Sequence, residues 1–178
     1  MKYRKAVSDD VYEIAKLVTD LLGSCNIESE KSILESNVEE ITKDINHYFV
    51  CTINDQIIGA CGISDILKQD TYHLNLKNVK EILYLVVHKK YQGRGIGTTL
   101  LKLCSKNNEC DILYEAWGDN KDHVNSKFIL ERCGYHMLKD LGRDYYQKNN
   151  YCYKCVNRYK NCNECVAQIW IKHKSQSI

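Results

Sequence analysis

The segment from Glu81 to Leu101 constrains the fold of this chain more than any other part of the sequence. An apolar run at 82–88, typical of a buried strand, leads into a basic turn, the loop QGRGIG at 92–97 and a helix-like apolar periodicity. The alternate glycines of the loop let the backbone turn sharply and approach a ligand closely. Loop N–H groups converge at the start of the helix, where the helix dipole favours an anion. The segment therefore predicts a phosphate-binding strand–loop–helix unit.

The spacing of the loop excludes two common phosphate-binding motifs. A dinucleotide-binding GxGxxG motif would need Gly or Ala where Thr98 stands, and an acidic residue at the end of a strand about 20 positions further on, which the expected strands do not provide. A P-loop would need GxxxxGK followed by Ser or Thr, which the chain lacks. The loop does match the pattern Q/R-x-x-G-x-G/A, with Gln92, Gly95 and Gly97 at the fixed positions.

On this motif, the segment resembles the coenzyme A pyrophosphate loop of the GNAT superfamily of N-acetyltransferases. A second anchor is the stretch ERCGY at 131–135, which is similar to the family's Glu-Lys-x-Gly-Phe at the end of the penultimate helix. The resemblance covers about the first 140 residues and the last strand. It implies the GNAT fold, an α/β architecture with a twisted mixed sheet and helices on both faces.

The pattern of apolar residues predicts an element order of β-α-α-β-β-β-α-β-α-β-β, which is that of the GNAT fold. A turn at Asn54 and Asp55 separates two strands of a hairpin. The stretch 64–79 is polar and is expected to be a loop. The strands are expected at 3–7, 48–53, 57–63, 82–88, 110–117, 135–138 and 166–171, and the helices at 8–23, 31–44, 96–104 and 121–132.

The length of 178 residues favours a single domain spanning 1–178. The resemblance implies that it is an acetyltransferase domain, with an insertion at about 150–166 between the last two strands. The 25 Lys and Arg residues nearly balance the 23 Asp and Glu residues, so no global field favours nucleic acid or a membrane. The N-terminus has no signal-peptide pattern and no apolar run could span a bilayer. We expect a cytoplasmic protein with no membrane partner.

The resemblance implies how acetyl-CoA is bound, in a gap where the strands at 81–88 and 110–117 splay apart. Backbone groups of Leu85, Val86 and Val87 would pair with the pantetheine arm, and the Leu85 N–H would stabilise the oxyanion of the tetrahedral intermediate. The expected pyrophosphate-binding residues are Gln92, Gly93, Arg94, Gly95, Ile96, Gly97 and Thr98. Lys89 and Lys90 add positive charge beside them.

Glu81 is the predicted general base. An alkyl ammonium has a pKa near 10, so a base is needed to free the attacking amine. Glu81 stands eleven residues before Gln92, the position of the base in histone-acetyltransferase-like members of the family. Burial in a half-apolar cleft would raise the pKa of its carboxyl and suit it to this role. Glu115 and His88 are lesser candidates, and His88 is expected to be a surface turn residue.

The chain departs from the family pattern at Leu130. Many members carry a tyrosine four residues before the glycine of Gly-Phe, and this tyrosine reprotonates the leaving thiolate. Counting back from Gly134 gives Leu130, which has no proton to donate. Water, a nearby tyrosine or His123 could take over, or the protein could bind coenzyme A as a sensor without turnover.

Four cysteines near the C-terminus form a metal-ligand pattern, Cys152-x-x-Cys155 followed by Cys162-x-x-Cys165. Two CxxC pairs can offer four thiolates to one tetrahedral ion, which predicts a closed, structural zinc site. An iron–sulfur cluster and two disulfides are the alternatives. The other six cysteines are scattered, and most are expected to be small core residues.

The acceptor is expected to be an amine of a small molecule or peptide, and the sequence leaves its identity open. The resemblance implies that the first two helices cap the acceptor side, and the acidic residues there, such as Glu28, Glu30, Glu35 and Glu39, favour a cationic acceptor. A homodimer is possible, since relatives often form one. A competing hypothesis is nucleic-acid binding through basic and aromatic residues near the cysteines, namely Tyr153, Lys154, Arg158, Tyr159, Lys160, Trp170, Lys172 and Lys174. The small basic excess weighs against it.

Overall fold

The computed structural model describes residues 1–22, 27–65, 74, 76–106, 109–118, 124–143, 145–148 and 165–174. Within these residues the chain forms seven strands and five α-helices, with three short 3-10 turns between them. The elements are β1 (Lys2–Lys5), α1 (Val11–Leu22), α2 (Ile27–Asp44), β2 (Tyr48–Ile53), β3 (Gln56–Ser64), β4 (Val79–Val87), α3 (Ile96–Cys104), β5 (Asp111–Gly118), α4 (Lys127–Arg132), β6 (His136–Gly142), α5 (Tyr145–Lys148) and β7 (Val166–Lys172).

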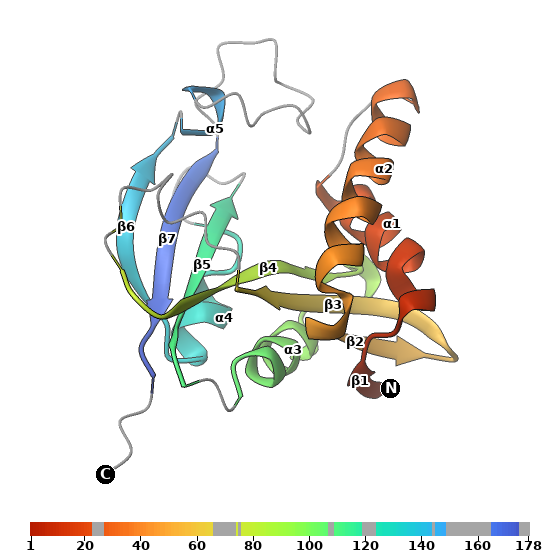
Figure 1. Cartoon of the computed structure of the whole chain (residues 1–178), viewed down its shortest axis with the longest axis horizontal. Helices are drawn as coiled ribbons and strands as arrows, with labels where there is room; N and C mark the ends of the chain where they lie inside the picture. Colours follow the sequence, from red (N-terminus) through yellow and green to blue (C-terminus); the bar gives the residue numbers. More distant parts are fainter. Residues whose placement is uncertain are drawn as a thin grey trace.

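The strands form one mixed sheet in the order β1-β2-β3-β4-β5-β7-β6. Only β4 and β5 run parallel among the described pairs; the other neighbours are antiparallel. Figure 1 shows β4 crossing the middle of the molecule, with β5, β7 and β6 turning away from β2 and β3. The predicted α/β fold is confirmed, and among the described strands and α-helices only α5 was not indicated by the sequence pattern.

Helices cover both faces of the sheet because each face carries apolar side chains. On one face, α3 buries Ile96, Leu100 and Leu101 against the strands, and Leu130 of α4 joins the same cluster. On the other face, α1 packs a second cluster, and α2 contributes Ile41 to it. The two clusters make the sheet the middle layer of a three-layer sandwich.

The hairpin between β2 and β3 follows the prediction closely. Asn54 and Asp55 both have positive φ angles, 49° and 63°. Positive φ at both central positions is typical of a type I′ turn, whose twist matches that of the flanking strands. Asn and Asp tolerate this conformation better than other residues that carry a Cβ.

Several element boundaries differ from the prediction. The helix expected at 121–132 is α4, which begins at Lys127, while residues 121–123 lie outside the described part of the chain. In the other direction, α2 begins at Ile27 and β6 continues to Gly142. The ends of these elements lie in polar stretches, where apolar periodicity carries no information about the boundary.

Asp10 links the segment just before α1 to β1 through hydrogen bonds, and its replacement should destabilise the fold. Its carboxylate accepts hydrogen bonds from both terminal nitrogens of Arg4, at 2.6 and 2.8 Å, and from the Val7 N–H at 2.8 Å. Asp10 is 7% exposed. Asp10→Asn should lower the free energy of unfolding by about 1–3 kcal/mol near neutral pH, because hydrogen bonds to a charged group are lost. Urea unfolding measures this, with the exposed neighbour change Asp9→Asn as control.

The pH dependence has a definite sign. The Arg4 guanidinium holds the pKa of Asp10 below its usual range, and the Val7 N–H adds to this against the cost of burial. A lowered pKa in the folded state gives stability that is present above the unfolded value, about 3.9, and is lost as the pH falls through the folded value. The difference between wild type and Asp10→Asn should therefore shrink on acidification. A difference that stays constant down to the acid-unfolding range would contradict this assignment.

Candidate active site

The parallel strands β4 and β5 part in the middle of the sheet. Their paired register runs from Val79 opposite Asp111 to Ile82 opposite Tyr114. Beyond this last pair β4 continues to Val87 and β5 to Gly118, with no further pairing between them in the described residues. The open side of β4 after Ile82 is therefore a free sheet edge inside the molecule, as the resemblance implied.

A bulge in β4 coincides with the parting point. Between Cys61 and Ile63 the antiparallel register of β3 advances by two residues, whereas β4 advances by three, from Leu85 to Ile82. The extra residue breaks the alternation of β4, so Leu83 and Tyr84 both contact the cluster under α1 and α2. A bulge bends a strand and increases its twist, which accounts for β4 leaving β5 at this point.

The register also shows which backbone groups of β4 face the gap. The His88 N–H donates to the Ile58 carbonyl at 2.8 Å. Hydrogen-bonded and non-bonded pairs alternate along antiparallel strands, so Val86, opposite Ala60, also directs its backbone groups toward β3. Leu85 and Val87 direct theirs to the other side, where the pantetheine arm was predicted. The side chain of Val86 is buried in the cluster under α1.

The glycine loop follows β4 after His88 and a 3-10 turn at Lys89–Tyr91. Gly93 and Gly95 have φ angles of 74° and 78°, a region that side chains with a Cβ rarely adopt. Gly97 differs from these two, since a Cβ there would lie 3.2 Å from Cδ1 of Ile129 in α4, which leaves room for little more than hydrogen. The Gln92 side chain donates to the Val87 carbonyl at 2.9 Å and ties the loop to the strand.

Backbone donors gather at the start of α3. The first helical hydrogen bond runs from the Thr99 N–H to the Gly95 carbonyl, at 3.0 Å. The N–H groups of Ile96, Gly97 and Thr98 precede it and have no carbonyl partner within the helix. Two positive side chains belong to the segment just before these donors: the Arg94 guanidinium and the Lys90 ammonium lie 5.5 and 5.7 Å from the centre of the Tyr91 ring. The loop can therefore receive an anion.

Glu81 lies one residue before the parting point. It pairs with Ser64 of β3 and Leu113 of β5, and it is 4% exposed. Directly opposed residues point to the same face of a sheet, so its carboxyl lies on the face that carries α1 and α2. Glu115, two residues after Leu113 on β5, belongs to that face as well. His88 is exposed, as expected, and its Nδ1 accepts from the Lys90 N–H at 3.2 Å.

Leu130 is fully buried within the cluster under α3, so it supplies no proton donor. A tyrosine from another element lies in the same cluster: Tyr114 of β5, opposite Ile82 at the parting point. Its hydroxyl lies beside the side chain of Ser126, the residue that precedes α4. Burial raises the pKa of Tyr114 well above its usual range, which keeps the hydroxyl protonated.

A polar group that the sequence analysis missed lies between α2 and the bulge. The Tyr84 hydroxyl donates to Glu40 Oε2 at 2.5 Å and lies 3.4 Å from Asn37 Oδ1. Asn37 is fully buried and donates to the Thr19 hydroxyl at 2.9 Å. The polar position of Asn37 within the apolar stripe of α2 was a signal of a buried contact. The orientation of Tyr84 depends on the bulge, which no sequence pattern indicated.

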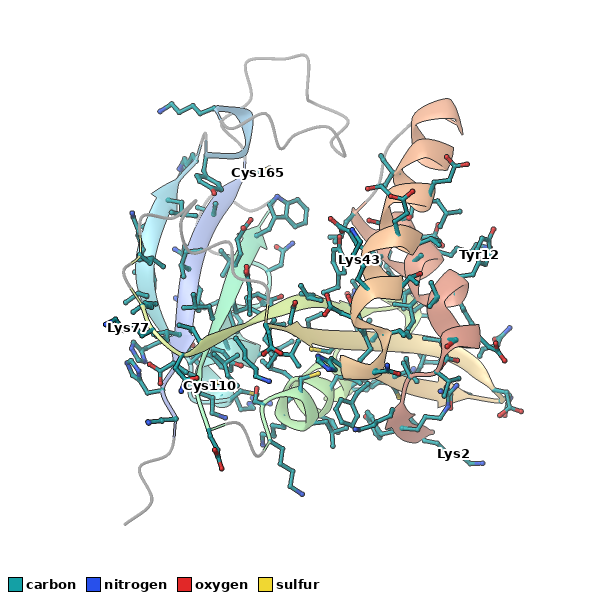
Figure 2. All side chains as sticks on the ribbon, in the orientation of Figure 1. Lys2, Tyr12, Lys43, Lys77, Cys110 and Cys165 are labelled. Atoms are coloured by element: carbon teal, nitrogen blue, oxygen red, sulfur yellow. The ribbon has the colours of Figure 1, made fainter. Side chains whose placement is uncertain are left out.

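Of the four cysteines predicted to bind a metal, the structure describes only Cys165. Cys152, Cys155 and Cys162 lie outside the described residues, and Cys165 stands half-buried just before β7 (Figure 2). No group of three or more metal-binding side chains occurs in the described part of the chain. Five of the six scattered cysteines are buried, as expected, and form no disulfide; these are Cys51, Cys61, Cys104, Cys110 and Cys133. Cys25 is not among the described residues.

Most residues of the nucleic-acid hypothesis, namely Tyr153, Lys154, Arg158, Tyr159 and Lys160, lie outside the described part of the chain. Trp170, expected to stack on bases, is 4% exposed, and its indole N–H donates to Gln168 at 3.1 Å. The Lys172 ammonium lies over the Tyr135 ring, 5.9 Å from its centre. In the ranges that the structure covers, no helix has the length and apolar character needed to cross a bilayer.

Comparison with known proteins identifies the class of protein that this fold and site define. Residues 44–151 match the family model described as "Acetyltransferase (GNAT) domain". The chain therefore belongs to the GNAT acetyltransferase family, whose members transfer acyl groups from acetyl-CoA.

Solved structures agree on the fold. An N-acetyltransferase from Staphylococcus aureus Mu50 superposes with a TM-score of 0.62 at 14% identity, over 96% of this chain and 100% of that one. An aminoglycoside 6′-acetyltransferase type Ii superposes with a TM-score of 0.63 at 14% identity, over all of both chains. Rv2747 from Mycobacterium tuberculosis, solved in complex with CoA, gives 0.58 at 12% identity, over 98% of this chain and 100% of that one.

Proposed function

We propose that this protein is an N-acetyltransferase that moves the acetyl group of acetyl-CoA to a primary amine by direct attack, with Glu81 as general base. The observation that carries the proposal is the alignment of three features along β4. These are a nearly buried carboxyl at Glu81, a free strand edge from the parting point onward, and the glycine loop that ends it.

The loop fits a pyrophosphate. A Cβ placed on Gly93 or Gly95 would meet no atom within 4 Å, so glycine at these positions leaves the space beside the backbone open. The orphan N–H groups at the start of α3 and the adjacent Arg94 supply donors and positive charge. The Gln92 side chain is hydrogen-bonded to the Val87 carbonyl and so holds the loop in place. The backbone of 93–98 then receives the phosphates.

The free edge of β4 then accepts the pantetheine arm as an extended strand would be accepted. Leu85 and Val87 supply backbone donors and acceptors. The Leu85 N–H is oriented to stabilise the oxyanion that forms when the amine attacks the thioester carbonyl. Glu81, on the opposite face from α3, takes a proton from the amine, directly or through water. Collapse of the intermediate breaks the C–S bond and releases CoA.

Calorimetry with acetyl-CoA, followed by a thiol-release assay across a panel of amines, tests this function. Binding in the micromolar range with thiol release on at least one primary amine supports the proposal. Binding with no release on any amine favours a coenzyme A sensor, the alternative suggested by Leu130. Absence of binding would refute the assignment of the loop.

Tyr114 is expected to assist departure of the thiolate in place of the missing tyrosine of α4. With its pKa raised by burial, the Tyr114 hydroxyl stays protonated and can donate a hydrogen bond to the leaving sulfur. Tyr114→Phe should lower kcat about tenfold, the value of one hydrogen bond to a charged group, with little change in affinity for acetyl-CoA. Steady-state kinetics at saturating acetyl-CoA measure this.

Tyr135→Phe is the matched control for Tyr114. Tyr135 is a second buried tyrosine of the same cluster, and its hydroxyl is 2.8 Å from that of Ser105. Its replacement should reduce stability by about 1 kcal/mol and leave kcat unchanged. An equal loss of kcat in both variants would indicate a general packing effect and contradict the role given to Tyr114.

We further propose, on the sequence pattern alone, that Cys152, Cys155, Cys162 and Cys165 hold one structural zinc ion in an insertion of a single domain. Cys155→Ser and Cys162→Ser should each reduce bound zinc from about one ion per chain to nearly none, because a closed site needs all four ligands. Elemental analysis of purified protein measures this. Cys110→Ser is the control, since Cys110 is buried and remote in sequence. An unchanged metal content in the two variants would refute the site.

A further inference from the structure

Polar side chains gather on the α2 side of the sheet next to the parting point. Ser64 of β3 is directly opposite Glu81, and its hydroxyl lies 3.3 Å from Asp44 Oδ1 at the end of α2. One turn earlier on α2, Glu40 contacts the Tyr84 hydroxyl. The carboxylates of Glu40 and Asp44 therefore lie on the same side of the sheet as the proposed base.

Neither carboxylate is neutralised within the described part of the chain. No cation lies within 4 Å of Glu40 or Asp44 in these residues. Lys43, adjacent to Asp44 and labelled in Figure 2, forms no ion pair with either of them. Glu40 is exposed, while Asp44 and Tyr84 are half-buried, so the group is reachable from solvent.

A buried hydroxyl without a partner points into this acidic group. Tyr48 of β2 is opposite Gly62 of β3, and a Cβ on Gly62 would lie only 2.4 Å from Tyr48 Cζ. The tyrosine ring thus extends across β3, and its hydroxyl is directed toward the bulge of β4. Tyr48 is fully buried, and its hydroxyl has no hydrogen-bond partner among the described residues.

The charged and polar groups that act on Tyr48 agree with this direction. Its pKa is raised far above the usual range, first by burial and then by the neighbouring Tyr84, Cys61, Asp44 and Glu40. A buried polar atom without a partner is rare in native proteins, because its desolvation is not compensated. An oxygen acceptor beside two unneutralised carboxylates is suited to an ammonium group, which carries three donors and no acceptor.

We propose that Glu40, Asp44, Tyr48 and Tyr84 form a subsite for a second cationic group of the acceptor, so that the preferred substrates are diamines or polyamines. The inference rests on the proposed function, since it assumes that the reacting amine lies at Glu81. Glu81 and Tyr84 are three residues apart on β4, which places the two positions about 7–10 Å apart. An alkyl chain of moderate length between two amines spans this separation.

The test compares linear α,ω-diamines of increasing length with monoamines of the same carbon count. We expect wild type to prefer diamines by about tenfold to a hundredfold in kcat/KM, the value of one or two charge-assisted contacts. Glu40→Gln should reduce this preference at least tenfold, mainly through KM. The exposed neighbour Glu39 provides the control, because Glu39→Gln should leave the preference unchanged.

Tyr48→Phe separates binding from packing. The phenylalanine ring fills the same space and removes only the unpartnered hydroxyl, so stability to urea should stay equal or rise. The preference for diamines should nevertheless fall several-fold. A variant that loses stability and keeps the preference would show that Tyr48 is only a core residue and overturn its assignment to the subsite.

Failure of this inference and failure of the proposed function give different results. Equal kcat/KM for diamines and monoamines, unaffected by Glu40→Gln, overturns the subsite and leaves the transferase intact. If no amine is acetylated, calorimetric titration of diaminobutane into the protein with CoA decides the question. Binding that Glu40→Gln weakens supports the subsite, whereas no binding, or binding that Glu40→Gln leaves unchanged, overturns it.

Discussion

Replacing Glu81 with glutamine should lower kcat/KM for amine acetylation by about 10²–10⁴ at neutral pH, the usual contribution of a positioned general base. Glutamine keeps the size of the side chain in a position that is 4% exposed, so the fold should persist. The amide cannot accept a proton from the incoming ammonium. The rate of the variant should therefore keep rising with pH toward the pKa of the amine itself, near 10.

The pH–rate profile distinguishes a lost base from a disturbed site. A disturbed site would lower the rate by the same factor at every pH, and it would also weaken acetyl-CoA binding, which Glu81→Gln should leave unchanged. Glu115 on β5 faces the same side of the sheet and is the alternative base. Activity that survives Glu81→Gln and is lost in Glu115→Gln would assign the role to Glu115.

The second large effect is expected at the glycine loop, where Gly95→Trp should weaken acetyl-CoA binding by at least about a hundredfold, the value of roughly two hydrogen bonds to phosphate. Gly95 has a φ of 78° and precedes the first turn of α3. An indole side chain there would strain the backbone and would occupy the open space beside the donors. Calorimetry with acetyl-CoA and with CoA measures the loss.

Gly134→Trp controls for the backbone strain. Gly134 has a comparable φ of 82°, and a Cβ there also meets no atom within 4 Å. It follows α4 and belongs neither to the glycine loop nor to the first turn of α3, so its replacement should cost a similar amount of stability and leave coenzyme binding unchanged. Equal loss of binding in both variants would attribute the effect to misfolding and contradict the assignment of the loop.

The sequence was most informative where local chemistry dictates local structure. The alternate glycines predicted a loop with positive φ angles, and Asn54–Asp55 predicted the hairpin turn, because few other residues adopt these conformations. Burial of the scattered cysteines followed from their apolar surroundings. Leu130, identified by counting from Gly134, is indeed buried and apolar.

Features that depend on the register between strands distant in the chain could not be predicted from the sequence. The bulge in β4 results from an unequal register with β3, which has no local signature. In a regular strand, Tyr84, three residues after Glu81, would lie on the opposite face of the sheet from Glu81. The contact between Tyr84 and Glu40 could therefore not be predicted from the sequence. The sequence pattern indicated only that Tyr48 belongs to a strand. The position of its ring depends on Gly62 of the next strand, where the missing Cβ leaves space for it. The backbone orientation that separates Leu85 and Val87 from Val86 likewise required the register.

The buried cysteines also allow local opening of the sheet to be measured through the reactivity of their thiols. Burial raises the pKa of the Cys51, Cys61 and Cys110 thiols, so in the closed state few thiolates are available to an alkylating reagent. Cys51 and Cys61 belong to β2 and β3, on one side of the parting between β4 and β5, whereas Cys110 adjoins β5 on the other. Alkylation rates of the individual cysteines, followed by mass spectrometry, would then measure how fast each half of the sheet opens. A coenzyme that spans the gap between β4 and β5 should make the alkylation rates of the two halves more nearly equal.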